Sequence, residues 1–216
     1  MGQNITEKQQ KVLETIYQNI KESGFPPTIA DLKEKLGVVS NQSVLNFLNV
    51  LERNGYIKRE DGQARGIKIL PLGFRILGKD QLVPVVGISA TGPFIASFDN
   101  AFSNWLTLPG QVLANEKVKQ AGDKLFAIQV HGDSMINAGI MDGDILLIKE
   151  EKEFRSGDIV VARNDDGTTI KKFIAENGRA YLKPENPAYK NIPIFEDTYF
   201  DGKVIANLSA VSRLNQ

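Results

Sequence analysis

A serine placed directly after an apolar run is the first candidate for chemistry. Ser134 stands in the sequence HGDSM at 131–135, which follows the apolar run Phe126–Val130. A serine beside glycine at the end of a strand can be held exposed on a tight turn. An alcohol is a poor nucleophile at neutral pH, so this serine needs a neighbouring general base. The pattern predicts nucleophilic catalysis only where such a base lies within reach.

The chain offers a histidine and two lysines as bases for Ser134. His131 lies three residues before it, although a histidine at the end of a strand more often serves packing. A lysine amine has a pKa near 10.4, so it acts as a base near pH 7 only if burial lowers that pKa by roughly three units, about 4 kcal/mol. Lys171 and Lys172 lie in the predicted strand 168–174, on its two opposite faces. Either could face inward, and a lysine on a solvated strand edge has no catalytic role.

The composition removes several other kinds of chemistry. The 216 residues include no cysteine, which excludes disulfides, thiolate metal sites, iron–sulfur clusters and cysteine nucleophiles. With one histidine, a histidine-rich metal site is not expected. The Asp-Gly sequences at 142–144 and 165–167 lack the spacing of an EF-hand, and we interpret them as turns. We expect no metal and no cofactor.

These candidates lie in a half of the chain that has the pattern of a β domain. From about Val83 onward, short apolar runs alternate with turns rich in glycine and aspartate. We predict a mainly β domain over residues 82–216, strongly bent or barrel-like. The predicted strands include Phe126–Val130, Ile145–Ile148, Asp158–Ala162, Thr168–Ile174 and Lys203–Val211.

The first 70 residues have the pattern of three helices and a hairpin. Thr6, Thr28 and Ser40 are capping residues, and apolar residues at helical spacing follow each of them. Strands are predicted at 56–59 and 66–70, around an Asp-Gly turn. Two short helices joined by a tight turn, with a hairpin behind them, have the order of a winged helix-turn-helix.

The segment between these halves has the composition of a linker. Residues 71–81 mix proline, glycine and charges without a period and are predicted to be a linker. The whole chain is thus expected to be an α+β protein of two domains, 1–70 and 82–216.

The overall composition is typical of a globular protein, with 26 basic and 26 acidic residues and 42 % hydrophobic content. The amino terminus lacks the apolar core of a secretory signal. We expect a cytoplasmic protein without a membrane partner.

The third predicted helix has polar side chains that suit DNA bases. Asparagine and glutamine can form two hydrogen bonds to adenine, and serine can bond to either member of a base pair. A solvated polar face is the alternative for any such helix alone, and the ordered set of helices, turn and basic hairpin favours DNA binding. The basic residues of the hairpin, expected to contact phosphates, are Lys58, Arg59, Arg65 and Lys68. The predicted DNA-contacting residues are Thr28, Ser40, Asn41, Gln42, Ser43, Leu45, Asn46 and Arg65.

Taken in order, these segments resemble the LexA-type repressors, the self-cleaving regulators of the bacterial SOS response. The resemblance extends over nearly the whole chain, and its order and spacing make it specific. In the first half it rests on the sequences TEKQQ at 6–10, GFPPT at 24–28, LERNGYI at 51–57 and ARGI at 64–67. In the second half it rests on VVG at 85–87, GDSM at 132–135, GIMDGD at 139–144, VVAR at 160–163, IKK at 170–172 and LKPEN at 182–186.

The resemblance implies a Ser–Lys dyad in which Ser134 is the nucleophile and Lys171 the neutral base. The substrate is then the chain itself, cut at the bond Thr91–Gly92. Such an intramolecular reaction gains a large effective concentration. The implied partners are double-stranded operator DNA, a RecA-type filament on single-stranded DNA that promotes cleavage, and a second copy of the chain. The homodimer is expected to form through the carboxyl domain, with Lys203–Val211 as the contacting strand.

At two places the sequence departs from the family pattern. Thr91 stands where the family usually has alanine, and its β-branched side chain is stiffer. Leu45 and Asn46 stand where well-known members have an acidic pair, so the operator is expected to differ. Thr91 leaves open a second interpretation, a DNA-binding regulator that keeps the peptidase fold without cleaving. A phage-type repressor of the same architecture is a further alternative.

Overall fold

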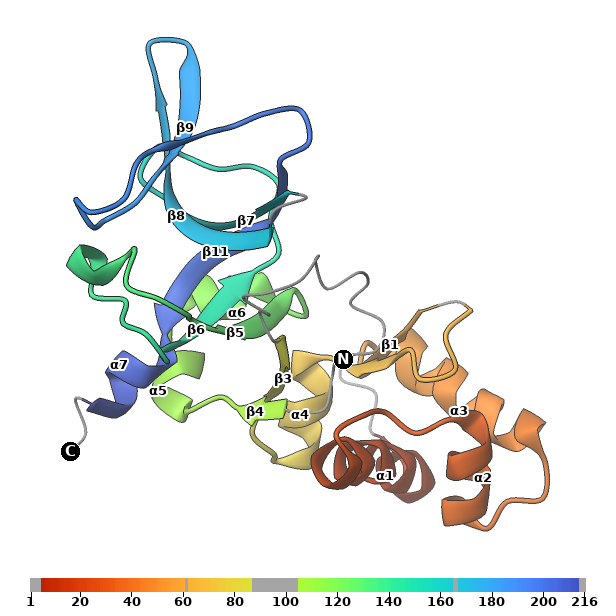
Figure 1. Cartoon of the computed structure of the whole chain (residues 1–216). Coiled ribbons are helices and arrows are strands. Elements are labelled where there is room, and N and C mark those ends of the chain that lie inside the picture. Colours follow the sequence, from red (N-terminus) through yellow and green to blue (C-terminus); the bar gives the residue numbers. More distant parts are fainter. Residues whose placement is uncertain (1–4, 61, 87–104, 165–166, 214–216) are drawn as a thin grey trace. The chain divides into compact units, whose positions relative to one another are not determined.

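The computed structural model describes residues 5–60, 62–86, 105–164 and 167–213 (Figure 1). This part of the chain forms two compact units, residues 5–82 with 105–110, and residues 83–86 with 111–213. The helices of the first unit and the large sheet of the second confirm the predicted α+β class. Over the same residues, no helix is long and apolar enough to cross a membrane.

Three helices, each begun by the predicted capping residue, form the framework of the first unit. The hydroxyls of Thr6 and Thr28 accept hydrogen bonds from backbone N–H groups three residues on, at 3.3 and 3.1 Å, and complete capping boxes. Ser40 accepts in the same way at 3.2 Å. These bonds satisfy N–H groups that have no partner within their own helix. The helices are α1 (Glu7–Ser23), α2 (Ile29–Leu36) and α3 (Asn41–Arg53).

A short hairpin completes the winged helix-turn-helix. β1 (Ile57–Arg59) pairs antiparallel with β2 (Ile67–Ile69), and both strands are shorter than predicted. The inward side chains of the hairpin belong to the same buried core as the apolar faces of the helices. Burying each of these side chains contributes about 1.5–3 kcal/mol, so the helices and hairpin stabilise one another. This core includes Leu13, Ile16, Leu32, Val44, Leu48, Leu51, Ile57 and Ile67.

The segment predicted to be a linker is partly a helix of the first unit. Helix α4 (Pro71–Leu77) has proline in its first turn and ends at Gly78, whose φ of 61° is left-handed. Phe74 of this helix is buried in the core, and its ring meets the ring of Tyr17 edge-on at 6.2 Å. The prediction of a linker over 71–81 is therefore wrong for 71–77, because one buried aromatic side chain holds the turn of helix against α1.

A later segment of the chain also belongs to the first unit. Strand β4 (Trp105–Thr107) brings the indole of Trp105 against the core, and its Nε1–H donates to the Gly24 carbonyl at 2.8 Å. The N–H of the fully buried Leu108 donates to the Gln81 carbonyl at 2.9 Å. Residues far apart in sequence thus complete the first unit.

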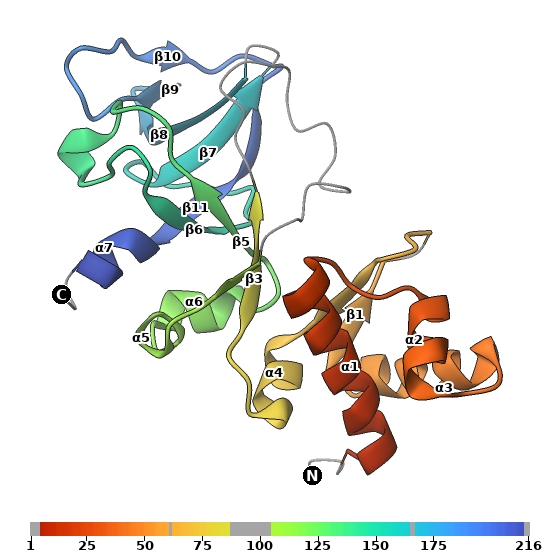
Figure 2. The same ribbon diagram turned by 60° about the horizontal axis from the view of Figure 1, so that its bottom comes forward.

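The second unit contains a strongly curved sheet (Figures 1 and 2). From one end its strands lie in the order β10, β9, β8, β7, β11, β6, β5, β3. The pairs are antiparallel except β3 with β5, which is parallel. The strands are β3 (Leu82–Val86), β5 (Leu125–Gln129), β6 (Ile145–Lys149), β7 (Ile159–Asn164), β8 (Gly167–Glu176), β9 (Arg179–Lys183), β10 (Ile192–Pro193) and β11 (Tyr199–Asn207). Short helices accompany them: α5 (Gly110–Leu113), α6 (Glu116–Ala121), the 3-10 turn η1 (Ile136–Ala138) and α7 (Leu208–Arg213).

β11 is the long central strand, and it ends earlier than predicted. It pairs with β7 over Tyr199–Lys203 and with β6 over Lys203–Asn207, with a shift of register in each ladder. A Cβ at Gly202 would collide with the Lys149 carbonyl, so glycine is required where the strand bends. The expected strand Lys203–Val211 is wrong beyond Asn207, because the Asn207 side chain accepts from the Ala210 N–H at 3.0 Å and begins α7.

Candidate functional site

The structure places Lys171, and not Lys172, beside Ser134. Alternation along β8 buries the Lys171 side chain, which is 6 % exposed, and brings its Nζ within 2.7 Å of Ser134 Oγ. Lys172 lies on the opposite face and forms an ion pair with Glu185 at 2.6 Å. That pair lowers the pKa of the Glu185 carboxyl. The two adjacent lysines therefore have different environments. The alternation of side chains along the strand had not shown which of the two faces inward.

Burial favours the neutral form of the Lys171 amine. Desolvation lowers its pKa to about 8, because the charged form loses its water without gaining a carboxylate. Besides Ser134, Nζ contacts Thr169 Oγ1 at 2.8 Å and the Ile170 carbonyl at 3.0 Å. A neutral amine has two N–H groups for these two acceptors. Its lone pair is then left for the Ser134 hydroxyl, which is the orientation that a general base requires.

The other sequence candidates for the reaction lie apart from this pair. His131 is exposed and makes no hydrogen bond to Ser134, so the histidine alternative is not supported. Asp142 and Asp144 accept from the N–H groups of Gly132 and Met141 at 2.7 and 2.9 Å, as expected of a turn. Among the residues that the structure describes, no group of three or more histidines and carboxylates could hold a metal ion. The bond Thr91–Gly92 lies outside the described residues.

The loop that holds the nucleophile is fixed by contacts with segment 185–189. The Asp133 carboxylate accepts from the Tyr189 hydroxyl at 2.6 Å and from Asn186 Nδ2 at 3.1 Å. The backbone N–H of Glu185 donates to the Ser134 carbonyl at 2.9 Å. Segment 185–189 thus holds both residues of the turn in place. Asn186 was noticed as part of a motif, but no local signal connects Tyr189 with a residue 56 positions earlier.

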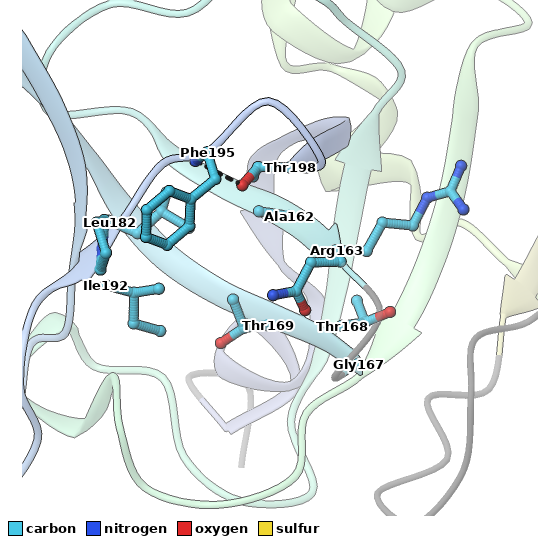
Figure 3. Close-up of a pocket in the computed structure, with 11 residues that line it drawn as sticks. Ala162, Arg163, Gly167, Thr168, Thr169, Leu182, Ile192, Phe195 and Thr198 are labelled. Carbon is cyan, nitrogen blue, oxygen red and sulfur yellow. Dashed lines mark hydrogen bonds between the residues drawn. The ribbon is translucent and has the colours of Figure 1, made fainter.

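A pocket of about 310 Å³ is lined by residues of β7, β8, β9 and β10 and of the segment that follows β10 (Figure 3). Thr169, whose hydroxyl contacts Lys171, stands at its edge with Thr168. Leu182, Ile192 and Phe195 form apolar walls, as Figure 3 shows. Much of the remaining lining is polar, so the pocket offers both apolar and hydrogen-bonding surface.

The polar face of α3 has the exposure that DNA contact requires. Asn41, Gln42 and Asn46 are exposed, and Gln42 Nε2 donates to Asn46 Oδ1 at 3.0 Å. Leu45, one of the predicted DNA-contacting residues, is only partly buried. Phe47 packs against the core instead. Ser40 and Ser43 share a hydroxyl–hydroxyl hydrogen bond of 3.0 Å at the start of the helix.

The basic hairpin is engaged in contacts within the unit. Arg59 binds Glu52 through two nitrogens, at 2.8 and 2.6 Å, and reaches Asn49 Oδ1 at 2.7 Å. Lys68 pairs with Glu60 at 2.6 Å. The Arg65 guanidinium lies 3.6 Å from the centre of the Phe25 ring. The Thr28 hydroxyl is used by its cap, as described above. Arg59 and Arg65 connect the hairpin with the helical part of the unit, and Lys68 pairs within the hairpin, so fewer charges are available to phosphates than the sequence suggests.

Comparison with known proteins identifies two regions of the chain. The family profile described as LexA DNA binding domain matches residues 2–66, and that described as Peptidase S24-like matches residues 84–205. A LexA repressor of Caldicellulosiruptor saccharolyticus is 37 % identical over 205 residues, covering 95 % of this chain and 97 % of the relative. A LexA repressor of Oleidesulfovibrio alaskensis is 37 % identical over 198 residues, 90 % and 91 % of the two chains. One of Geobacillus kaustophilus is 35 % identical over 205 residues, 93 % and 95 %. The resemblance predicted from the sequence is confirmed, and the chain belongs to the LexA repressor family.

Proposed function

We propose that this chain represses SOS genes by binding operator DNA and is inactivated when it cleaves itself with Ser134 and Lys171. The observation that carries the proposal is the 2.7 Å contact between Lys171 Nζ and Ser134 Oγ. This contact lies in the part of the chain that matches a peptidase family. That part follows, in the sequence, the part that matches a DNA-binding domain.

The reaction follows from the protonation state of the two side chains. Neutral Lys171 takes the proton of the Ser134 hydroxyl while Oγ attacks the Thr91 carbonyl carbon. The resulting ammonium then gives its proton to the amine of Gly92, the peptide bond breaks, and Thr91 remains as an ester on Ser134. Lys171 next takes a proton from water, whose oxygen attacks the ester, and Ser134 is released with its proton restored. Thr169 and the Ile170 carbonyl keep the amine directed at Ser134 throughout.

The substrate of this reaction is the chain itself, at Thr91–Gly92. A tethered bond meets the dyad at an effective concentration that a separate peptide does not reach, which offsets the weak nucleophile. We further propose that the pocket beside Thr169, whose apolar walls are Leu182, Ile192 and Phe195, accepts a side chain of that segment. A RecA-type filament on single-stranded DNA raises the population of the cleavable conformation, and the dyad performs the chemistry.

The first unit binds double-stranded operator DNA through α3. Asn41, Gln42 and Asn46 contact base edges, because they are exposed on one helix and have amide groups. Ser40, Ser43, Leu45, Thr28 and Arg65 complete the interface as neighbours of the DNA backbone and bases. Hydroxyls and a guanidinium suit phosphate oxygens, and an apolar side chain suits a thymine methyl.

Operator binding requires two copies joined through the second unit. Val204–Asn207 of β11 pairs with β6 but is beyond the stretch that pairs with β7, which favours this part of the strand for the dimer contact. Cleavage separates two half-site contacts that the dimer had joined, so the affinity for the operator falls.

A specific residue supports one alternative. Thr91 is β-branched where the family usually has alanine, so a repressor that keeps the dyad but does not cut is the second candidate. A phage-type repressor of the same architecture would differ from the first candidate only in its operator.

The test is incubation of the purified chain alone near pH 10, where the Lys171 amine is neutral. Mass spectrometry is expected to find fragments 1–91 and 92–216. Ser134→Ala and Lys171→Met should give no fragments, whereas Lys172→Met, the neighbour on the opposite face, should cut like the unaltered chain. An unaltered chain that stays intact, both at pH 10 and with the filament, would establish the non-cleaving alternative.

A further inference from the structure

A cut at Thr91–Gly92 would separate two strands from the units to which they belong. Each strand would stay covalently attached to the other fragment. The chain leaves the first unit at residue 82, contributes 83–86 to the second, returns to the first at 105–110 and then completes the second. The bond Thr91–Gly92 lies between the two crossings. Fragment 1–91 therefore includes β3, and fragment 92–216 includes β4.

β3 is built into the second unit. Val85 and Val86 pair in parallel with Ala127 and Ile128 of β5. The side chains of Val83 and Val86 are 1 % and 6 % exposed, so the strand is paired and buried. After the cut, the amino-terminal fragment still holds the second unit through this strand.

β4 is in turn built into the first unit. The Trp105 indole packs against the core of helices α1 to α3 and donates to the Gly24 carbonyl at 2.8 Å. Leu108 is fully buried, and its N–H donates to the Gln81 carbonyl at 2.9 Å. After the cut, the carboxyl-terminal fragment still holds the DNA-binding unit through these residues.

We propose that the cleaved repressor remains a non-covalent complex, in which β3 and Trp105 bind each fragment to the other, and that separation is a distinct second step. The inference rests on the proposed function for the position of the cut, but it holds for any single cut between 87 and 104. Loss of operator binding then follows the release of these strands and lags behind cleavage. The surface of the first unit around Gly24 is thereby a binding site for the carboxyl-terminal fragment.

The experiment makes the cut without the dyad. In the Ser134→Ala chain, residues 93–98 are replaced by the recognition sequence of a specific protease, and the chain is cut to completion. Denaturing gels follow the cut, while size exclusion and tryptophan emission follow separation. Trp105 is the single tryptophan of the chain, so its emission reports on this contact alone. We expect the pieces to elute together at the volume of the uncut chain, with the emission shifting to the red later than the cut.

Matched variants connect the result with the strand. Trp105→Ala should let the pieces separate at least ten times faster, and Trp105→Phe, which keeps a ring without the indole N–H, should lie between. Thr107→Ala, in the same strand but with an exposed side chain, should leave the rate unchanged. Pieces that separate as fast as they form, or equal rates for Trp105→Ala and Thr107→Ala, would overturn the proposal. Because Ser134 is absent throughout, neither outcome depends on self-cleavage.

Discussion

The buried amine of Lys171 predicts a specific dependence of self-cleavage on pH. With a pKa of about 8, the rate should rise about tenfold per pH unit from pH 6 to near 8 and then level off. At pH 7 about a tenth of the amine is neutral, whereas an amine at the ordinary value of 10.5 would be neutral in about 0.03 % of molecules. Burial thus raises the amount of active base at pH 7 by about 300-fold.

The same shift has a cost in stability, since the folded chain releases this proton more readily than the unfolded chain. Between pH 8 and 10.5 the unfolded state binds more protons, so the contribution of Lys171 to stability rises with pH. Below pH 8 the full penalty, about 3 kcal/mol, is present. Lys171→Met removes the penalty but also the hydrogen bonds to Thr169 and Ile170, so we expect a net gain of about 1–2 kcal/mol at pH 7.

The assay is the initial rate of fragment formation from pH 6 to 10.5 at constant ionic strength, measured on gels. Urea unfolding of Ser134→Ala with and without Lys171→Met, at pH 7 and at pH 10.5, measures the cost. The gain from Lys171→Met should disappear at the higher pH and become a loss of about 1 kcal/mol, because the penalty is then nearly gone while the hydrogen bonds to Thr169 and Ile170 are still missing. A rate that climbs tenfold per unit through pH 10 would refute the reasoning, because the amine would then be unperturbed.

Three further substitutions test other contacts. Hydrogen bonds from Arg213 hold the pKa of the buried Asp144 carboxyl at about 2, so its stabilisation is present above pH 4 and is lost as pH falls towards 2. Asp144→Asn should lower the free energy of unfolding by about 2 kcal/mol at pH 7 and by little at pH 2.5, as urea titration can show. Tyr189→Phe, which removes the hydroxyl bound to Asp133, should slow cleavage about tenfold with an unchanged midpoint of the pH–rate profile, and an unchanged rate would contradict the role of that contact. Gln42→Ala should lose about 1–3 kcal/mol of discrimination at one operator base pair in binding titrations, and equal preference would remove Gln42 from the interface.

Local patterns in the sequence are sufficient to predict α1, α2 and α3. Thr6, Thr28 and Ser40 act within four residues of themselves, so their caps are predictable without tertiary structure. Helix α4 also has local signals, proline at its start and Gly78 at its end. It was missed because seven residues form a stable helix only when a side chain such as Phe74 is buried elsewhere.

In the candidate site, too, local sequence patterns identify some residues and not others. Ser134 is visible as a residue type in a turn, but the choice of Lys171 depends on which face of β8 is buried in the folded unit. Tyr189 and Trp105 act on partners 56 and 81 residues away, and no periodicity connects such pairs. The contacts that fix the reactive loop, and the contact of Trp105 with the helices of its own unit, therefore had to come from the three-dimensional structure.

The central position of β11 has a consequence for the newly made chain. Ser134 lies in the connection between β5 and β6, and Lys171 lies in β8, next to β7. β11 stands between β6 and β7 and joins these two parts of the sheet. A ribosome adds residues 199–207 after both members of the dyad, so the sheet that brings them together is completed late in synthesis. If Ser134 and Lys171 cut the chain as proposed, a growing chain is expected not to cut itself before β11 has been made.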